Sequence, residues 1–156
     1  MTDNALTFKW SRPDYVLAWG FGAGLAPVAP GTMGTLAAIP LYLGFKTFCP
    51  SIYLAVIVLG FIIGVYICSR VNRELGREDH PGIVWDEIVG FWVAMVGSPV
   101  TWEYILAGFL LFRLFDIGKP WPVSWLDEKV RGGLGIMLDD LVAGIMAALV
   151  LNFLPL

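Results

Sequence analysis

Five long apolar runs, separated by polar loops, constrain the fold of this chain more than any other feature. Residues 52–70 and 136–154 are each close to the ~20 residues that an α-helix needs to cross a bilayer. Residues 31–46, 85–97 and 101–117 form shorter runs. Only 15% of the residues are charged, whereas soluble proteins carry roughly 25%. With 58% hydrophobic residues in 156, a water-soluble fold would have too little interior to bury them. The chain is therefore expected to be an integral membrane protein.

Residues 1–14 are polar and predict a short N-terminal tail, and residues 15–156 predict a single membrane-embedded domain. The domain opens with a segment, Tyr15–Pro30, that is apolar but rich in glycine and proline. Proline removes a backbone donor and glycine lowers helix propensity, so a continuous spanning helix is disfavoured there. We expect a re-entrant or interfacial segment instead. The predicted fold is an all-α polytopic membrane helical bundle, with about four to five membrane-embedded helices plus this segment.

The basic residues predict how the bundle is oriented. If the N-terminus, the loop at 70–82 and the region 113–133 share one side, that side holds nine of the ten basic residues. These are Lys9, Arg12, Arg70, Arg73, Arg77, Arg113, Lys119, Lys129 and Arg131. Because basic loops tend to stay in the cytoplasm, this side is expected to be cytoplasmic, with Lys46 alone on the other side. The net charge of −3 leaves no basic stripe for nucleic acid, which excludes that class of partner.

Five carboxylates fall near the cytoplasmic ends of the predicted helices in this topology. They are Asp86, Glu87, Asp116, Asp139 and Asp140. The first two open one run, Asp116 ends the next, and the last two are expected in the first turn of the final helix. A carboxylate in or near hydrocarbon costs ~2.5 kcal/mol or more, so it usually faces the interior of the bundle and has a partner there.

Two interpretations of these acids are open. Acids at helix N-termini can cap free N–H groups, and Arg113 or Lys119 could pair with Asp116. Capping accounts for one acid of each adjacent pair, but the second points about 100° away around the helix. A shared metal site accounts for both. Oxygen donors without a cysteine favour a hard cation, most simply Mg²⁺.

The segment PGTMGT, residues 30–35, stands directly before an apolar run and predicts an anion-binding turn. Gly31 and Gly34 give the backbone freedom to present its N–H groups, and Thr32 and Thr35 add hydroxyls. The same composition is also typical of a helix cap without a ligand. The segment is not a P-loop, because the GxxxxGK[ST] pattern is absent.

His80 is the only histidine and lies six residues before Asp86. It could act as a general acid or base or contact a phosphate. It could equally be a solvated loop residue without a role.

Four stretches together resemble the signature blocks of a known family. They are LAPVAPGTMGTLAAIP, HPGIVWDEIVGFW, FRLFDIGKPWP and GGLGIMLDDLVAG. In this order they are similar to the blocks of the bacterial phosphatidylglycerophosphatase A family, from about Trp19 to Gly144. The resemblance implies a Mg²⁺-dependent lipid phosphatase of the bacterial inner membrane, which hydrolyses phosphatidylglycerophosphate to phosphatidylglycerol and inorganic phosphate in phospholipid biosynthesis.

The resemblance also implies roles for the motif residues. The metal ligands would be Glu87, Asp116, Asp139 and Asp140. The catalytic residues would be Asp86, His80, Lys119 and Arg113. The phosphate would be bound by Gly31, Thr32, Gly34, Thr35, Lys119 and Arg113. We expect Asp86 to be either a further metal ligand or a base that orients water, and His80 to protonate the leaving glycerol oxygen. Metal-activated water is preferred over a covalent route through Thr32.

A rival function comes from the same acids, which could relay ions or protons in a small membrane transporter. A transporter should place acids near mid-membrane and show related halves, and neither feature appears in the sequence. A CDP-alcohol phosphotransferase is a second rival, but its DG…AR…G…D…D pattern is absent. Phosphate release separates the phosphatase from the transporter. The sequence leaves the oligomeric state open.

Overall fold

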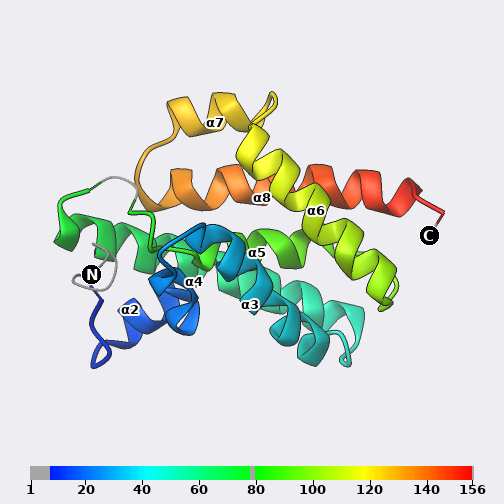
Figure 1. The fold of residues 1–156 in the computed structure, drawn as a ribbon, viewed down its shortest axis with the longest axis horizontal. Coiled ribbons are helices and arrows are strands. Elements are labelled where there is room, and N and C mark those ends of the chain that lie inside the picture. The colour runs from blue at the N-terminus through cyan, green and yellow to red at the C-terminus, as the bar shows by residue number, and fades with distance from the viewer. Residues whose placement is uncertain (1–7, 78–79, 156) are drawn as a thin grey trace.

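The computed structural model describes residues 8–77 and 80–155, so residues 1–7 of the predicted tail lie outside it. The described residues form helices and connecting loops without a strand, which confirms the all-α prediction. In chain order the elements are α2 Pro13–Ala18, the 3₁₀ segment η1 Gly20–Leu25, α3 Pro30–Phe45, α4 Pro50–Leu75, α5 Trp85–Ala94, α6 Trp102–Gly118, α7 Val123–Lys129 and α8 Gly132–Phe153. Helix α8 packs against α4, α5, α6 and α7, and α5 lies between α8 and α3 (Figure 1).

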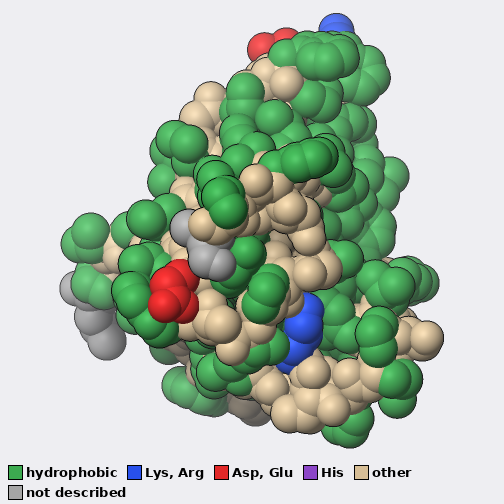
Figure 2. All heavy atoms as spheres, turned by 90° about the vertical axis from the view of Figure 1, so that its right-hand side faces the viewer, with side chains coloured by type: hydrophobic (Ala, Val, Ile, Leu, Met, Phe, Trp, Pro, Cys, Tyr) green, Lys and Arg blue, Asp and Glu red, His purple; other side chains and the backbone are tan. Residues whose placement is uncertain are grey.

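Two helices in the described part of the chain are long and apolar enough to cross a membrane, α4 and α8. The other helices are shorter. Helix α5 has 10 residues and is therefore only about 15 Å long. The end of the molecule that holds the α3–α4 turn and the C-terminal end of α8 is mostly hydrophobic (Figure 2). Trp102 and Phe153 are among its most exposed side chains, at 71% and 86%. The expected count of four to five membrane-embedded helices is therefore not confirmed, since two of the described helices have the length and composition of a membrane span.

The segment from Tyr15 to Pro30 is not one continuous helix, as its composition predicts. Helix α2 ends at Ala18, and η1 is interrupted by positive φ angles at Phe21 and Gly22. Ala29 then adopts the left-handed conformation just before α3 begins. These reversals let the chain turn twice within a short length, so α2 and α3 lie on different parts of the bundle.

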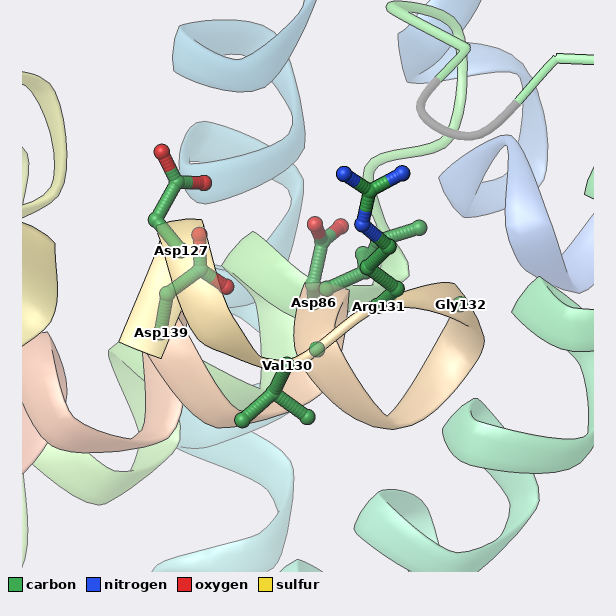
Figure 3. A pocket seen from close by; sticks show the side chains of 8 residues that line it. Asp86, Asp127, Val130, Arg131, Gly132 and Asp139 are labelled. Carbon is green, nitrogen blue, oxygen red and sulfur yellow. The ribbon is translucent and has the colours of Figure 1, made fainter. Parts of the chain in front are cut away.

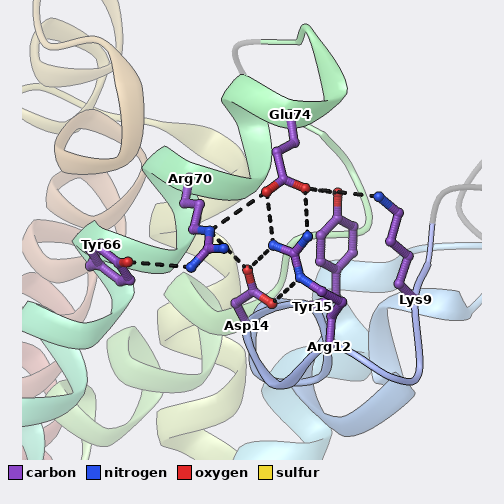
Figure 4. A network of polar contacts seen from close by, with 7 residues as sticks. All are labelled: Lys9, Arg12, Asp14, Tyr15, Tyr66, Arg70 and Glu74. Atoms are coloured by element: carbon purple, nitrogen blue, oxygen red, sulfur yellow. Dashed lines mark hydrogen bonds and ion pairs between the residues drawn. The ribbon is translucent and has the colours of Figure 1, made fainter.

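An ion-pair network fastens α2 to the C-terminal end of α4 (Figure 4). Arg12 contacts Asp14 at 2.5 Å and Glu74 at 2.8 Å. Arg70 contacts the same two acids at 3.3 and 3.6 Å. The Tyr15 hydroxyl donates to Glu74 at 3.3 Å. Residues 12 to 14 of the predicted tail are therefore part of the folded bundle.

The closest approach in the bundle is the crossing of α5 and α8. A Cβ atom built on Gly144 would lie 2.4 Å from the Gly90 carbonyl oxygen, so the two backbones are in direct contact. Phe112 of α6 covers the same point, because a Cβ on Gly90 would lie 2.7 Å from its ring. Only glycine leaves room for this contact. The crossing sets how far α5 and α8 are apart one turn away, at Glu87 and Asp140.

Buried aromatic side chains tie α5 to its neighbours. The Trp85 indole donates to the Gly60 carbonyl at 2.9 Å, and the Trp92 indole donates to the Ala38 carbonyl at 3.2 Å. The Tyr53 hydroxyl donates to the Trp92 carbonyl at 2.6 Å. The polar atoms of these three rings thus each have a partner, as large amphipathic side chains usually do in a core. Helix α5 is held on two sides although it is short.

We predict that Gly144→Val destabilises the bundle, because the added side chain must push α5 away from α8. Overpacking of this kind costs about 1–3 kcal/mol, which thermal unfolding of the purified protein in detergent would show as a lower Tm. Gly44→Ala is the matched control, since a Cβ there meets no atom within 4 Å. A Tm for Gly144→Val equal to that of Gly44→Ala would contradict the close crossing.

Asp14 makes the stability of the network depend on pH. The hydrogen bond from Arg12 lowers the pKa of Asp14 more than burial raises it. A carboxyl with a lowered folded pKa stabilises the protein above its unfolded pKa of about 4, and this contribution is lost as pH falls through the folded pKa. Asp14→Asn should therefore cost on the order of 1 kcal/mol at pH 7. The difference in Tm between wild type and Asp14→Asn should shrink below about pH 4. Glu128→Gln, outside the network, should show no such dependence.

Candidate active site at a buried carboxylate cluster

Three carboxylates meet where α5 crosses α8. Asp86, Glu87 and Asp140 each offer an oxygen, and these oxygens lie within 4.8 Å of one another. Asp140 is 3% exposed. Among the described residues, neither Oε2 of Glu87 nor Oδ2 of Asp140 has a hydrogen-bond partner, although both atoms are buried. Like charges so close together and out of water repel strongly, so the cluster calls for a cation.

The position of Asp139 and Asp140 in α8 corrects the sequence interpretation. Helix α8 begins at Gly132, four residues and about one turn before the expected start at residue 136. The glycines remain helical because they pack closely: a Cβ on Gly133 would lie 2.3 Å from the Ser69 hydroxyl, and one on Gly135 would lie 2.1 Å from a loop carbonyl. Capping of the helix start therefore cannot explain these two acids. Asp86 and Glu87 do lie in the first turn of α5, but without a side-chain cap hydrogen bond.

Helix α6 supplies one cation and one acid to the cluster. Arg113 and Asp116 are an i,i+3 pair in direct contact, and each side chain is 14% exposed. The same Arg113 nitrogen lies 3.9 Å from Oε1 of Glu87. The proposed pairing of Asp116 with Arg113 is thus present. It does not remove the need for a further cation, because Arg113 is one charge among several acids.

Lys119 supplies the second cation, from the residue that ends α6. Its ammonium donates to Asp139 at 2.9 Å and to Asp127 at 2.6 Å. The other Asp139 oxygen accepts a hydrogen bond from the Asp140 backbone at 3.0 Å. Burial lowers the pKa of Lys119, but the hydrogen bonds to the two aspartates outweigh it and raise the pKa overall. Lys119 is therefore positively charged at neutral pH.

Two cavities open onto the cluster. The larger, about 340 Å³, has walls from the start of α3, the loop before α5, the first turn of α5, the end of α6 and the N-terminal half of α8. Its charged lining residues are Asp86, Glu87, Arg113, Asp116, Lys119, Asp139 and Asp140. The smaller, about 120 Å³, lies on the other side of Asp86 and Asp139, where Asp127 and Arg131 also line it (Figure 3). All five predicted acids and both predicted cations thus line one continuous space.

The predicted anion-binding turn reaches the site through Gly31 alone. Gly31 lines the larger cavity, and a Cβ on it would lie 2.2 Å from Oε1 of Glu87. Thr35 is fully buried and donates to the Gly31 carbonyl at 2.9 Å. Gly34 packs on Val84. Neither of these two residues nor Thr32 is among the lining residues of the cavity.

His80 is not among the cavity-lining residues either. It is 1% exposed, and its ring lies against Trp19 at a centroid distance of 5.2 Å. Its Nδ1 accepts a hydrogen bond from the Gly82 backbone at 3.0 Å. An accepting Nδ1 is unprotonated. The histidine thus shapes the turn that leads into α5.

Two lining residues were missed in the sequence. Asp127 and Arg131 lie at the end of α7 and in the loop after it. Their charge at the edge of a polar loop is typical of solvated residues, and no spacing links them to the acids. They reach the cluster because α7 folds back onto α8.

The chain is similar to known proteins over most of its length. A family model described as phosphatidylglycerophosphatase A matches residues 16–155. Phosphatidylglycerophosphatase A of Escherichia coli K12 is 48% identical over 148 residues, 94% of this chain and 86% of that protein. Phosphatidylglycerophosphatase A of Haemophilus influenzae Rd is 43% identical over 159 residues, 96% of this chain and 94% of that protein.

A more distant relative carries another name. A Bacteroides thetaiotaomicron protein, provisionally named a phosphatidylinositol-3-phosphatase, is 35% identical over 145 residues, 86% of this chain and 90% of that protein. No solved structure matches the chain. Because the family model covers nearly the whole sequence, the chain belongs to the phosphatidylglycerophosphatase A family.

Proposed function

We propose that this protein is a Mg²⁺-dependent phosphatidylglycerophosphatase. It would hydrolyse the terminal phosphate of phosphatidylglycerophosphate, giving phosphatidylglycerol and inorganic phosphate. The observation that carries the proposal is the buried group of Asp86, Glu87 and Asp140 in one cavity with Arg113 and Lys119. Membership of the family, and relatives that carry this activity as their name, supply the substrate.

The cluster fits a hard divalent cation. Its donors are carboxylate oxygens, and two of them, Oε2 of Glu87 and Oδ2 of Asp140, are buried with no hydrogen-bond donor among the described residues. We propose that Glu87 and Asp140 bind Mg²⁺ together with Asp116 and Asp139. When bound, the cation would polarise the phosphoryl group and neutralise its charge.

The chain's own residues supply the remaining chemistry. Arg113 and Lys119 line the cavity and are paired there with carboxylates. Both can donate hydrogen bonds to the phosphoryl oxygens of the substrate as negative charge develops on them. Asp86 lines both cavities and would orient the attacking water. Lys119 would donate a proton from its ammonium group to the leaving glycerol oxygen. Since Thr32 is not a cavity-lining residue, direct attack by water is favoured over a covalent route.

His80 would contribute by fixing the turn that precedes Asp86. Its buried ring is hydrogen-bonded to the turn that precedes Asp86, so we propose it as a positioning residue rather than as the proton donor. Gly31 would contribute in a similar indirect way, since its lack of a side chain leaves room for the Glu87 carboxylate.

The polarity of the molecule supports a site at the cytoplasmic face of the bacterial inner membrane. Arg73, in the last turn of α4, and Arg77, just after it, lie at the same end of the bundle as the start of α8. We propose that α4 and α8 span the membrane, that α3, α5 and α6 are embedded beside them, and that residues 15–156 act as one phosphatase domain. The acyl chains would stay in the bilayer while the terminal phosphate reaches the acids.

We predict that purified wild-type protein in detergent releases phosphate from phosphatidylglycerophosphate with Mg²⁺ and not with EDTA. Asp140→Asn should lower the rate by roughly 100-fold or more, because it removes a central charge of the site. Glu103→Gln, at the other end of α6, should keep wild-type activity. Mn²⁺ titration followed by EPR should show weaker metal binding in Asp140→Asn than in wild type, and unchanged binding in Glu103→Gln. No phosphate release from folded protein would favour the transporter.

We predict that Gly31→Ala lowers activity without unfolding the protein. The new methyl group would displace Glu87 by about 1 Å or more, and such a misplacement can cost on the order of 100-fold in rate. Gly44→Ala, in the same helix but with open space around it, is the control and should retain full activity. Equal rates for the two variants would argue against Glu87 as a residue of the reaction centre.

A further inference from the structure

A third cavity at the polar end of the bundle has no part in the proposed reaction. It measures about 360 Å³ and lies between the last turns of α4 and the start of α8. Its lining residues are Ser69, Asn72, Arg73, Gly76, Arg77 and Gly132. Two arginines, one serine and one asparagine thus contribute to the lining, and no acidic residue is among the described residues that line it.

This basic cavity adjoins the carboxylate cluster. Gly132 lines both the basic cavity and the 120 Å³ cavity of Asp86, Asp139 and Arg131. The two aspartates in turn line the large cavity of the proposed active site. Figure 3 shows the side chains of Asp86 and Arg131 pointing to the same side of α8. The three cavities therefore follow one another along the polar end of the molecule.

The arginines of α4 differ in their partners. Arg70 is paired with Asp14 and Glu74. Arg73 is exposed, lines the basic cavity, and makes no hydrogen bond or ion pair with another residue that the structure describes. A guanidinium has a planar set of donors that matches phosphate oxygens, and it binds phosphate more specifically than an ammonium does.

We propose that the basic cavity is a second phosphate-binding site, connected to the reaction centre through the cavity that Arg131 lines. A phosphate dianion released among five carboxylates is repelled by them, whereas Arg131, Arg73 and Arg77 provide positive charge at increasing distance. The ligand is a phosphate group, either inorganic phosphate leaving the site or the headgroup of an anionic phospholipid. Only the role in product release rests on the proposed phosphatase function.

The test measures phosphate binding without turnover. Full-length protein in neutral detergent, with EDTA and without substrate, is titrated with ³²P-labelled inorganic phosphate. The double variant Arg73→Gln/Arg77→Gln should bind phosphate about tenfold more weakly or worse, because two charge-assisted contacts are lost. Lys129→Gln, which removes an exposed charge from α7, should bind within about twofold of wild type. Both sites of change are exposed, so the core stays intact.

Competition identifies the source of the phosphate group. The titration is repeated in mixed micelles that contain phosphatidylglycerol or phosphatidylcholine. If phosphatidylglycerol displaces the bound phosphate and phosphatidylcholine does not, the proposal is supported and the ligand is a lipid headgroup. If neither lipid displaces it, the proposal is supported and the ligand is inorganic phosphate. No binding by wild type, or equal binding by wild type and the double variant, overturns the proposal. Since no hydrolysis is measured, a failure of the phosphatase function would show only in the activity assay.

Discussion

The mutual repulsion of buried carboxylates is the constraint on which the rest of this structure depends. Asp86, Glu87 and Asp140 are close together and largely removed from water, which raises the free energy of the fold unless cations are near. The bundle provides Arg113 and Lys119 at its edge and leaves two central oxygens without a donor among the described residues. The proposed metal-assisted phosphoryl chemistry would use this arrangement, because a bound cation would offset the repulsion.

Backbone contact between glycines makes the cluster possible. Carboxylates on two helices approach this closely only if the helix axes do, and the direct contact of Gly90 with Gly144 brings α5 and α8 together next to the acids. The same principle holds at Gly31, where the missing side chain leaves the space that Glu87 occupies. Small residues thus determine the geometry of the charged ones.

Much of the fold and part of the site could be predicted from the sequence. Helical structure, the interruption within Tyr15–Pro30 and the five acids follow from local patterns of apolar residues, glycine, proline and charge. The start of α8 could not be predicted, because glycines at 133 and 135 have low helix propensity and are helical here where they pack on α4 and on a loop. His80 shows the same limit, since its loop position indicated an accessible group and the structure buries it against Trp19.

By itself, the sequence determined the class of molecule and the set of chemical groups. Its hydrophobicity and acid content require an apolar helical bundle whose few carboxylates have partners, because hydrocarbon solvates neither free backbone groups nor charges. Only the tertiary structure decided which groups meet. It placed Arg131 and Asp127 beside the acids and kept Thr32 and Thr35 out of the cavity lining. Such distances depend on how helices far apart in the chain cross, and crossings are set by side-chain volumes on both partners at once.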